Sequence, residues 1–402
     1  MPSVLMEAAS AALIGKPIPA LCDSCLGRLF ASLERGQDNA SRGRLIRPAL
    51  PALPQGVCSV CQDLLEKVPY YAGLAERDLA LWDYDTFLVG ARVEPETAAR
   101  EEMLWQTLGC GGEETLKAEV TREIGKLLEN RLGKEPEFLH PDIVVLVDTG
   151  FDSVSLQVNS MYLSGNYRKL SREIPQARWP CKRCLEKGCD RCEGRGTLYP
   201  TSVQEILSAP FLAEGSAVRT RIHALGREDV DARMLGSGRP FVLELLTPKR
   251  RHFDLEAVSR LINASGLVEV EGLRASSRIQ ARALKESRAE KTYRIQVRFD
   301  EKVSLERLKE AVNLLAHSEI QQRTPTRVLH RRGDRLRCRK VSAGTVEEYG
   351  GETATLLLRT EAGTYVKELV SGDGGRTEPC LAGAVQVPCR VEELDVLEVH
   401  TR

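Results

Sequence analysis

Eight of the twelve cysteines form four C-x-x-C pairs, and this is the feature that most restricts how the 402-residue chain can fold. The pairs are Cys22 and Cys25, Cys58 and Cys61, Cys181 and Cys184, and Cys189 and Cys192. Two residues between thiolates let both sulfurs face one ion, and two such turns complete a tetrahedral site. In a reducing compartment such pairs are metal clamps more often than disulfides. The sequence therefore predicts two structural Zn²⁺ sites, one from the first four cysteines and one from the last four.

Two alternatives to zinc remain open at the level of sequence. Thioredoxin-like redox chemistry uses a single C-x-x-C pair and does not need a second one. The last four cysteines lie within the twelve residues CKRCLEKGCDRC, a spacing short enough for an iron–sulfur cluster. Neither group has an obvious open ligand position. We therefore interpret both metals as replacements for cores that such short segments cannot build.

The composition is that of an ordinary soluble protein, with 42% apolar and 28% charged residues. No apolar run approaches the roughly 20 residues needed to span a bilayer, and the N-terminus lacks the order of a signal peptide. We expect a cytoplasmic protein with no membrane association. No obligate protein partner is evident from the sequence.

Charge is balanced overall but not locally. Lys plus Arg and Asp plus Glu number 57 each, so the total does not indicate a nucleic-acid partner. Residues 321–340, however, hold eight Lys or Arg against one Asp, and residues 165–183 hold six against one Glu. Such basic segments neutralise phosphates in nucleic-acid-binding proteins, although each alone is equally explained as a solvated face.

Hydrophobic periodicity predicts an α+β protein. Before residue 180 we expect helices at 96–108 and 114–132, and strands at 86–93, 143–147 and 154–158. After residue 200 we expect strands at 217–225, 241–246, 267–273, 292–299, 353–358 and 394–400, with helices at 255–262 and 305–315. This order permits, without specifying, a mixed, mostly antiparallel sheet with helices against it.

The segment GREDVDARMLGSGRPF, residues 226–241, is predicted to be a long charged loop between two of these strands. Loops held by a rigid sheet are where catalytic groups concentrate. An Asp flanked by arginines can stay ionised and oriented, which a carboxylate nucleophile requires. The alternative is a solvated loop with ordinary surface ion pairs.

This segment resembles the catalytic-aspartate motif of pseudouridine synthases, in particular the archaeal and eukaryotic tRNA pseudouridine synthase family with a THUMP-type RNA-binding region and cysteine-rich zinc sites. CLGRLF at 25–30 and YLSGNYRKLSREIPQARWPC at 162–181 also resemble that family. The resemblance implies Asp229 as nucleophile and Arg227 as its charge partner. Asp231 would then pair with Arg233 or Arg239 to fix the loop.

Three later strings, KTYRIQVRF, QRTPTRVLHRR and GTYVKELVSGDGGRTEP, resemble further motifs of the family. The resemblance implies that these strings supply substrate-binding residues. Tyr293 would stack on the base, and Tyr365, Val366 and Lys367 would place an apolar wall and a cation beside the nucleophile. The phosphate contacts would come from Arg323, Arg327, Arg331 and Arg332. In the basic segment 165–183, Tyr167 and Trp179 offer stacking surfaces for single-stranded RNA. Core packing and solvated surface are the plain alternatives for all of these side chains.

The resemblance implies a zinc-binding segment at 1–65, a THUMP-like RNA-binding domain at 66–180, a zinc knuckle at 181–200 and a pseudouridine synthase catalytic domain at 201–402. The implied activity is isomerisation of uridine to pseudouridine at positions 54 and 55 of the tRNA T-arm, with base flipping and without an organic cofactor. The alternatives are a non-catalytic RNA-binding zinc protein and another THUMP-type tRNA-modifying enzyme. The cofactor loops of the latter are not found.

Overall fold

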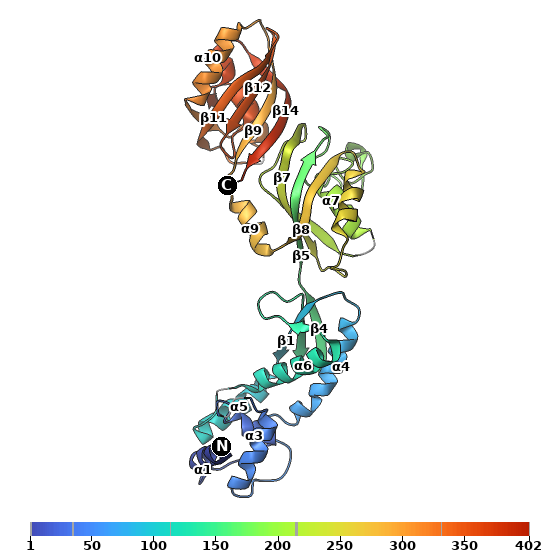
Figure 1. Cartoon of the computed structure of the whole chain (residues 1–402), viewed down its shortest axis with the longest axis vertical. Helices are drawn as coiled ribbons and strands as arrows, with labels where there is room; N and C mark the ends of the chain where they lie inside the picture. The colour runs from blue at the N-terminus through green and yellow to red at the C-terminus, as the bar shows by residue number, and fades with distance from the viewer. Residues whose placement is uncertain (1, 34–35, 113, 214–215, 331, 402) are drawn as a thin grey trace. The chain divides into compact units, whose positions relative to one another are not determined.

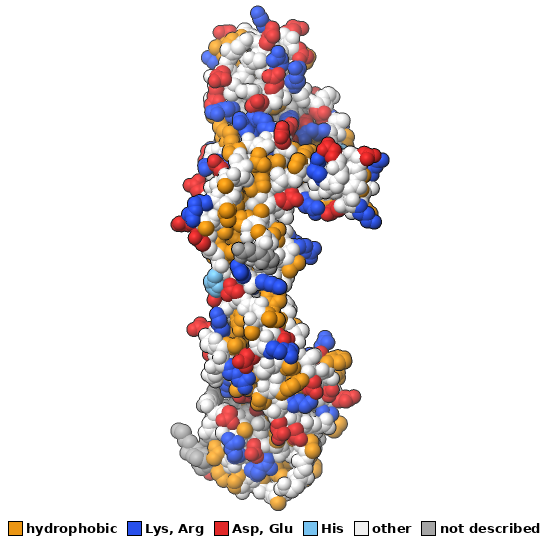
Figure 2. Space-filling model, turned by 90° about the vertical axis from the view of Figure 1, so that its right-hand side faces the viewer, with side chains coloured by type: hydrophobic (Ala, Val, Ile, Leu, Met, Phe, Trp, Pro, Cys, Tyr) orange, Lys and Arg blue, Asp and Glu red, His pale blue; other side chains and the backbone are white. Residues whose placement is uncertain are grey.

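The computed structural model describes residues 2–33, 36–112, 114–213, 216–330 and 332–401. The chain forms two compact units (Figure 1). Unit 1 comprises Met1–Asn159 with Lys249–Arg251, and unit 2 comprises Ser160–Pro248 with His252–Arg402. In the described ranges, every helix is too short or too polar to cross a membrane. Over the face shown in Figure 2, Lys and Arg side chains are interspersed with Asp and Glu, as the balanced totals suggest.

Unit 1 combines an N-terminal helical region with a small sheet. Its helices are α1 (Pro2–Leu13), α2 (Asp23–Arg28), α3 (Asn39–Ile46), η1 (Arg47–Ala49), η2 (Leu64–Lys67), α4 (Val68–Leu79), α5 (Pro95–Leu108) and α6 (Leu116–Leu132). Its strands are β1 (Thr86–Arg92), β2 (Glu135–Pro136), β3 (Ile143–Asp148) and β4 (Ser153–Val158), in the order β2-β1-β3-β4. Helix α6 begins where the Thr115 side chain accepts from the amide of Ala118 and ends at the left-handed Gly133. The sequence predicted α5, α6, β1, β3 and β4 to within two residues at each end.

One hydrophobic core runs through unit 1. It contains Leu26 of α2, Tyr71 of α4 and Ile143 of β3, each fully buried. The guanidinium of Arg28 is also buried and bonds Glu101 of α5 and Glu119 of α6. Residues 1–65 therefore share their core with the sheet, and the structure divides the chain differently from the expected boundary at residue 65.

The segment Lys249–Arg251 packs within unit 1 although both of its flanks belong to unit 2. Arg251 donates to the carbonyls of Asp142 at 3.0 Å and Asn159 at 2.6 Å, and its amide donates to the Asp83 carboxylate at 2.7 Å. The chain thus leaves unit 2 for three residues and returns.

Unit 2 is built on one sheet, ten-stranded within the described residues. Its strands are β5 (Met161–Lys169), β6 (Arg219–Ala224), β7 (Ala232–Leu246), β8 (Val268–Ser276), β9 (Glu290–Phe299), β10 (Glu319–Arg323), β11 (Leu336–Tyr349), β12 (Thr353–Thr360), β13 (Thr377–Glu378) and β14 (Cys389–His400). The order is β13-β10-β11-β12-β9-β14-β7-β5-β8, with β6 paired to β7. Strand β14 runs parallel to β7, and its other neighbour, β9, is antiparallel to it. The expected mixed, mostly antiparallel sheet is confirmed.

Helices pack on this sheet around two cores that meet at Tyr293 of β9. These helices are η3 (Asp190–Cys192), α7 (Val203–Leu212), α8 (Leu255–Asn263), α9 (Arg278–Glu286), α10 (Leu305–Ala316), η4 (Thr326–Val328), α11 (Val366–Ser371) and α12 (Leu381–Val385). Figure 1 shows α10 beside β11 and β12, and α7 beside the β5, β7 and β8 part of the sheet. Tyr293 therefore lies at the junction between two packed halves of unit 2.

Two segments differ from the sequence-based interpretation. Strand β5, expected within an RNA-binding domain ending at residue 180, pairs with β7 on one side and β8 on the other, so it belongs to the sheet of unit 2. The charged loop expected to reach Phe241 ends at Asp231, because β7 begins at Ala232. A central strand satisfies its backbone groups on both edges, and this pairing outweighs the polar sequences of both segments.

Candidate active site

The loop 226–231, which we call the catalytic loop, joins β6 to β7 and is held from below by buried side chains. The ammonium of Lys169, with 0% exposure, donates to the carbonyl oxygens of Val230 at 2.7 Å and Asp229 at 3.2 Å. Gln176 donates its amide to the carbonyl of Gly226 at 3.0 Å. Burial lowers the pKa of Lys169 to about 8, with the nearby carboxylates opposing the shift. The backbone of the loop is thereby fixed at three points.

Successive side chains of the loop point in opposite directions. Glu228 is fully buried and lies 2.9 Å from the guanidinium of Arg239, whereas the Asp229 side chain is 37% exposed. Two adjacent residues of the loop thus place one carboxylate in the interior and the other at the surface. The loop thus presents Asp229 to solvent from a rigid base.

Two cations converge on Asp229. Arg327 of η4 places its Nη1 3.1 Å from Asp229 Oδ2 and donates through Nε to Glu368 at 2.7 Å. Lys367 of α11 lies 3.8 Å from Asp229 and 2.6 Å from Asp231. Three segments far apart in sequence, the catalytic loop, η4 and α11, therefore meet around one carboxylate.

The ion pairs of the loop differ from those expected. Arg227 lies over the ring of Trp179, 5.3 Å from its centroid, and Arg327 and Lys367 lie 3.1 Å and 3.8 Å from Asp229. Asp231 pairs with Lys367. The two partners proposed for Asp231 are engaged elsewhere, Arg233 with Asp395 at 2.7 Å and Arg239 with Glu228. The sequence identified charged residues that interact, but side chains from distant segments determine which of them pair.

Tyr293 and Val366 supply apolar surface next to these charges. Burial raises the pKa of Tyr293 to about 12, and the carboxylates of Asp229 and Glu228 add to the shift. Val366 is 5% exposed and belongs to the core shared by β9 and α11. The expected Tyr293 ring thus lies within electrostatic reach of Asp229, as a neutral phenol. Tyr167, expected to stack on RNA, is instead fully buried, because its hydroxyl bonds Glu228 and Gln176.

The basic residues expected at phosphates lie around the same loop. Arg332 donates to the hydroxyl of Tyr365 at 2.8 Å, and Arg323, 54% exposed, lies 3.5 Å from Asp334. Tyr365 is itself held by Gln322, which bonds both its amide and its carbonyl. Arg331 lies outside the described residues. The exposed Arg332 is thus anchored at the N-terminus of α11, where Tyr365 is the N-cap residue.

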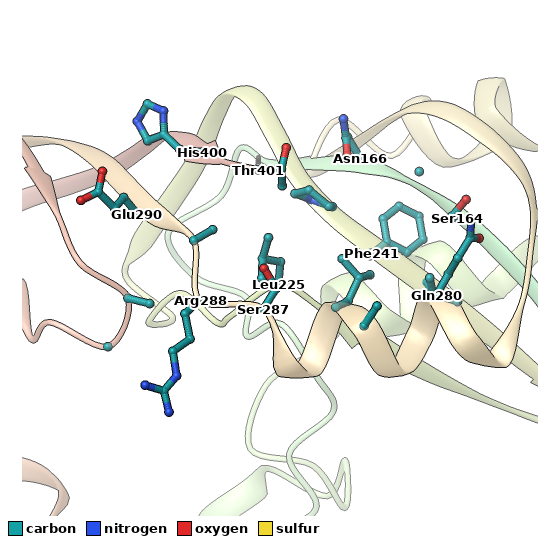
Figure 3. A pocket seen from close by; sticks show the side chains of 18 of the residues that line it. Ser164, Asn166, Leu225, Phe241, Gln280, Ser287, Arg288, Glu290, His400 and Thr401 are labelled. Carbon is teal, nitrogen blue, oxygen red and sulfur yellow. The ribbon is translucent and has the colours of Figure 1, made fainter.

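A separate cavity of about 1360 Å³ lies between α9 and the sheet. Figure 3 shows Ser164, Phe241 and Gln280 along α9, with Glu290 and His400 at the other end. Glu290 and Tyr293 are three residues apart on β9, so their side chains lie on opposite faces of the strand. The cavity therefore opens on the face opposite to Tyr293 and is distinct from the site at Asp229.

The four-cysteine groups are assembled in the structure. Within the described part of the chain, the sulfurs of Cys22, Cys25, Cys58 and Cys61, and those of Cys181, Cys184, Cys189 and Cys192, each lie within 4.8 Å of one another. Cys22 and Cys61 are 3.7 Å apart, and Cys184 and Cys192 are 3.8 Å apart. Thiolates bound to one tetrahedral ion at ~2.3 Å lie about 3.8 Å apart, so both groups fit such an ion. The backbone amides of Cys25 and Cys189 also donate to the sulfurs of Cys22 and Cys192, respectively.

The sequence analysis did not identify several side chains that hold the site in place, namely Lys169, Gln176, Glu228 and Glu368. It named Arg239 but did not identify it as buried. One signal was available. Arg239 has the same strand parity as Phe241, Leu243 and Leu245, which are buried, so alternation along β7 marks Arg239 as inward-facing. Lys169 likewise shares strand parity with the buried Leu163 and Tyr167 of β5, whereas for Glu368 no local pattern distinguishes an inward charge from a surface one.

Comparison with known proteins matches both units. A family model described as Pus10, C-terminal, covers residues 162–400, and one described as Pus10 THUMP domain, archaeal, covers residues 71–148. A relative from Methanothermobacter marburgensis is 42% identical over 388 residues, covering 94% of this chain and 95% of its own. Another from Methanothrix thermoacetophila is 40% identical over 415 residues, covering 94% and 91%. Both are named tRNA pseudouridine synthase Pus10.

These matches, together with the assembled carboxylate site, define a tRNA pseudouridine synthase with a THUMP domain. Within that class the chain belongs to the Pus10 family. A solved Cbf5–Nop10–Gar1 complex also matches, at 20% identity and a TM-score of 0.29 over 49% of this chain and 43% of that one, which is too low a score to carry an argument. The family's THUMP model ends at residue 148 and its C-terminal model begins at 162, in agreement with the division between the two units.

Proposed function

We propose that this protein isomerises uridine to pseudouridine at positions 54 and 55 of the tRNA T-arm, with Asp229 as the nucleophilic carboxylate. The observation that carries the proposal is the convergence of Arg327 and Lys367 on Asp229, with Tyr293 within electrostatic reach. Each of these residues comes from a different segment of the chain. The names of the relatives support the reaction class.

A uridine inside a folded tRNA must leave its stack before a carboxylate can reach it. Attack at C1′, attack at C6 and removal of a sugar proton all start from the Asp229 carboxylate, which Arg327 and Lys367 hold in place. Tyr293 stacks against the extruded base, and Val366 closes the apolar side. The uracil, once freed, rotates so that C5 bonds to C1′. No organic cofactor takes part in this sequence of steps.

The remaining parts of the proposal concern metals and partners. Each four-cysteine group holds one Zn²⁺, which supplies folding stability and no reactive site, because all four ligand positions are thiolates. The partner is tRNA, bound through phosphate contacts from Arg323, Arg331 and Arg332, and the tRNA substrate places the protein in the cytoplasm.

Activity on an unmodified tRNA transcript tests the nucleophile. Asp229→Asn should abolish pseudouridine formation and leave tRNA affinity nearly unchanged, since the variant removes the nucleophile and no phosphate contact. Asp231→Asn is the matched control and should keep measurable turnover, because Asp231 is 65% exposed and pairs with Lys367 at the edge of the site. An active Asp229→Asn with an inactive Asp231→Asn would reverse the assignment, and two active variants would reject the carboxylate mechanism.

Position specificity is tested on transcripts with cytidine at position 54, at position 55 or at both. The proposal expects one pseudouridine from each single replacement and none in the T-arm from the double replacement. Product formed elsewhere in the doubly replaced transcript would place the substrate outside the T-arm while keeping the reaction class.

A further inference from the structure

The residue next to the proposed nucleophile is part of a buried charge cluster. Glu228 has a side chain with 0% exposure, 2.9 Å from the guanidinium of Arg239, which is itself 1% exposed. Both carboxylate oxygens of Glu228 accept from the hydroxyl of Tyr167 at 3.0 Å. Burying two charges costs several kcal/mol per ion before their attraction is counted, and an apolar pair of similar size often supports a fold equally well. Fold stability alone therefore does not explain why ionic residues occupy this position.

Both Arg239 and Tyr167 of the cluster are connected to the start of the catalytic loop. Arg239 donates to the carbonyl of Leu225 at 2.6 Å, just before the loop begins. Gly226 follows with a φ of +84°, and a Cβ at this position would lie 3.1 Å from Nη1 of Arg239. Gln176 links the hydroxyl of Tyr167, at 2.8 Å, to the carbonyl of Gly226. The start of the loop therefore rests directly on the Arg239 guanidinium.

The same cluster determines where Asp229 points. The Glu228 side chain is held inward, and the side chain of the next residue, Asp229, faces Arg327 and Lys367. Arg239 and Glu228 also shift the pKa of Tyr293, Arg239 downward and Glu228 upward. The pair therefore acts on both side chains proposed to contact the nucleotide, Asp229 and Tyr293. Neither charged group of the pair is exposed to solvent, so neither is available to touch RNA.

We propose that Glu228 and Arg239 form a positioning pair, which fixes the direction of the Asp229 carboxylate and controls turnover without contacting the nucleotide. The inference rests on the proposed role of Asp229. Displacement of a reacting group by about 1 Å costs on the order of 100-fold in rate, so a positioning pair has a kinetic signature that a stabilising pair lacks.

The test replaces the pair by apolar residues of similar size, in the variant Glu228→Leu with Arg239→Met. Removing both charges avoids an uncompensated buried ion, so the melting temperature should stay near that of the unaltered protein. The single-turnover rate at saturating tRNA should nevertheless fall by at least about 10-fold, with the Kd for tRNA within about 2-fold. A double variant with unaltered melting temperature and unaltered rate would overturn the proposal.

Unit 2 contains a matched control. Glu244 of β7 contacts His223 at 2.9 Å and the hydroxyl of Tyr162 at 3.2 Å. The His223 side chain is only 10% exposed and that of Glu244 only 12%. This arrangement, like the positioning pair, combines a buried carboxylate with a nitrogen group and a tyrosine hydroxyl, at a place outside the catalytic loop. Glu244→Leu with His223→Leu should leave the single-turnover rate of the folded protein unchanged, and an equal loss of rate would show that any buried pair in the sheet matters as much.

A second variant covers the case in which the double variant does not fold. Tyr167→Phe removes the contacts of the hydroxyl with Glu228 and Gln176 and keeps the ring, so it should fold and lower the single-turnover rate by about 3-fold or more. Failure of the double variant to fold together with a full rate for Tyr167→Phe would reject the positioning role. Asp229→Asn, measured in parallel, separates the two proposals. If it is inactive while the double variant is fully active, only the positioning inference fails; if it is active, the assignment of the nucleophile fails.

Discussion

Arg327 is the residue that connects the basic segment to the proposed nucleophile. Its guanidinium pairs with Asp229 at 3.1 Å and with Glu368 at 2.7 Å, and the Glu368 side chain is only 7% exposed. A buried carboxylate that accepts from one side of a guanidinium holds the other side in place. The second face of Arg327 is therefore directed at Asp229, while Arg332 remains exposed next to Tyr365.

The two arginines should therefore behave differently when replaced. Arg327→Gln should lower the single-turnover rate by about 10-fold or more with little change in the salt dependence of tRNA binding, because it removes the partner of the carboxylate. Arg332→Gln should reduce the slope of log affinity against log salt by roughly one unit and leave the rate at saturating tRNA unchanged. The reverse pattern, with the slope altered in the Arg327 variant only, would make Arg327 a phosphate contact.

Lys169 gives a prediction for the dependence of stability on pH. Its pKa is lowered from 10.5 to about 8, mainly by burial. Between these values the unfolded chain binds more protons than the folded one, so this group makes stability rise with pH across that window. The free energy of unfolding of the unaltered protein should thus increase relative to that of Lys169→Met between pH 8 and 10.5, as measured by urea unfolding. Lys291, whose pKa is also lowered to about 8, is present in both proteins and cancels. Parallel curves would contradict the lowered pKa of the buried Lys169.

At the level of single residues, the sequence showed which side chains meet at the site. It did not show which of these side chains contact each other. Asp229, Tyr293 and Lys367 were expected near one another because they lie in motifs of the family, and the structure brings them together. Arg327, expected at a phosphate, pairs with Asp229 instead. The partners that fix them, such as Glu368 and Lys169, are contacts across dozens of residues. Periodicity carries no information on contacts of that range.

Among the elements, helices α2 and α3 show the tightest approach, and glycine allows it. A Cβ on Gly27 would lie 1.9 Å from the carbonyl oxygen of Asn39, and one on Gly43 would lie 1.8 Å from that of Asp23. These distances are far below van der Waals contact, so the two helices could not pack as they do with any larger residue. Helix α2 starts at the first cysteine pair, where Cys22 caps it. The helix contact thus supports the geometry of the metal group.

Gly43→Ala should therefore lower the melting temperature of unit 1 and weaken metal retention by the first cysteine group. Gly73→Ala in α4 is the matched control, because a Cβ there meets no atom within 4 Å and alanine favours helix over glycine by about 1 kcal/mol. The control should be neutral or stabilising in calorimetry. Equal melting temperatures for the two variants would mean that α2 and α3 move apart at little cost.

Strong periodicity explains which elements the sequence predicted. Helix α10 and strands β9 and β12 alternate or repeat apolar residues clearly, and their bounds were close to those observed. Strands β5 and β11 were missed because both carry charged residues on the open face of the sheet and few apolar ones. Their strand character follows from pairing with neighbours, which becomes visible only in three dimensions.

For the whole molecule, the two cysteine groups belong to different units, and each should stabilise its own unit. The chain should bind two equivalents of zinc, and Cys22→Ser should leave one and lower the melting temperature of unit 1 before it affects chemistry. Cys181→Ser should also leave one and spare unit 1. Metal analysis and calorimetry on both variants test this. Iron–sulfur absorption in the visible range, or a Cys22→Ser protein of normal stability without activity, would contradict it.

The three residues Lys249–Arg251 have a consequence for cleavage of the chain. They are covalently part of the polypeptide that follows residue 160, yet their hydrogen bonds are to Asp83, Asp142 and Asn159. A protease that cuts once after Asn159 would release no free catalytic fragment, because the downstream piece would still carry a strap embedded in the upstream one. The two fragments should therefore co-elute in size-exclusion chromatography until the strap is also removed.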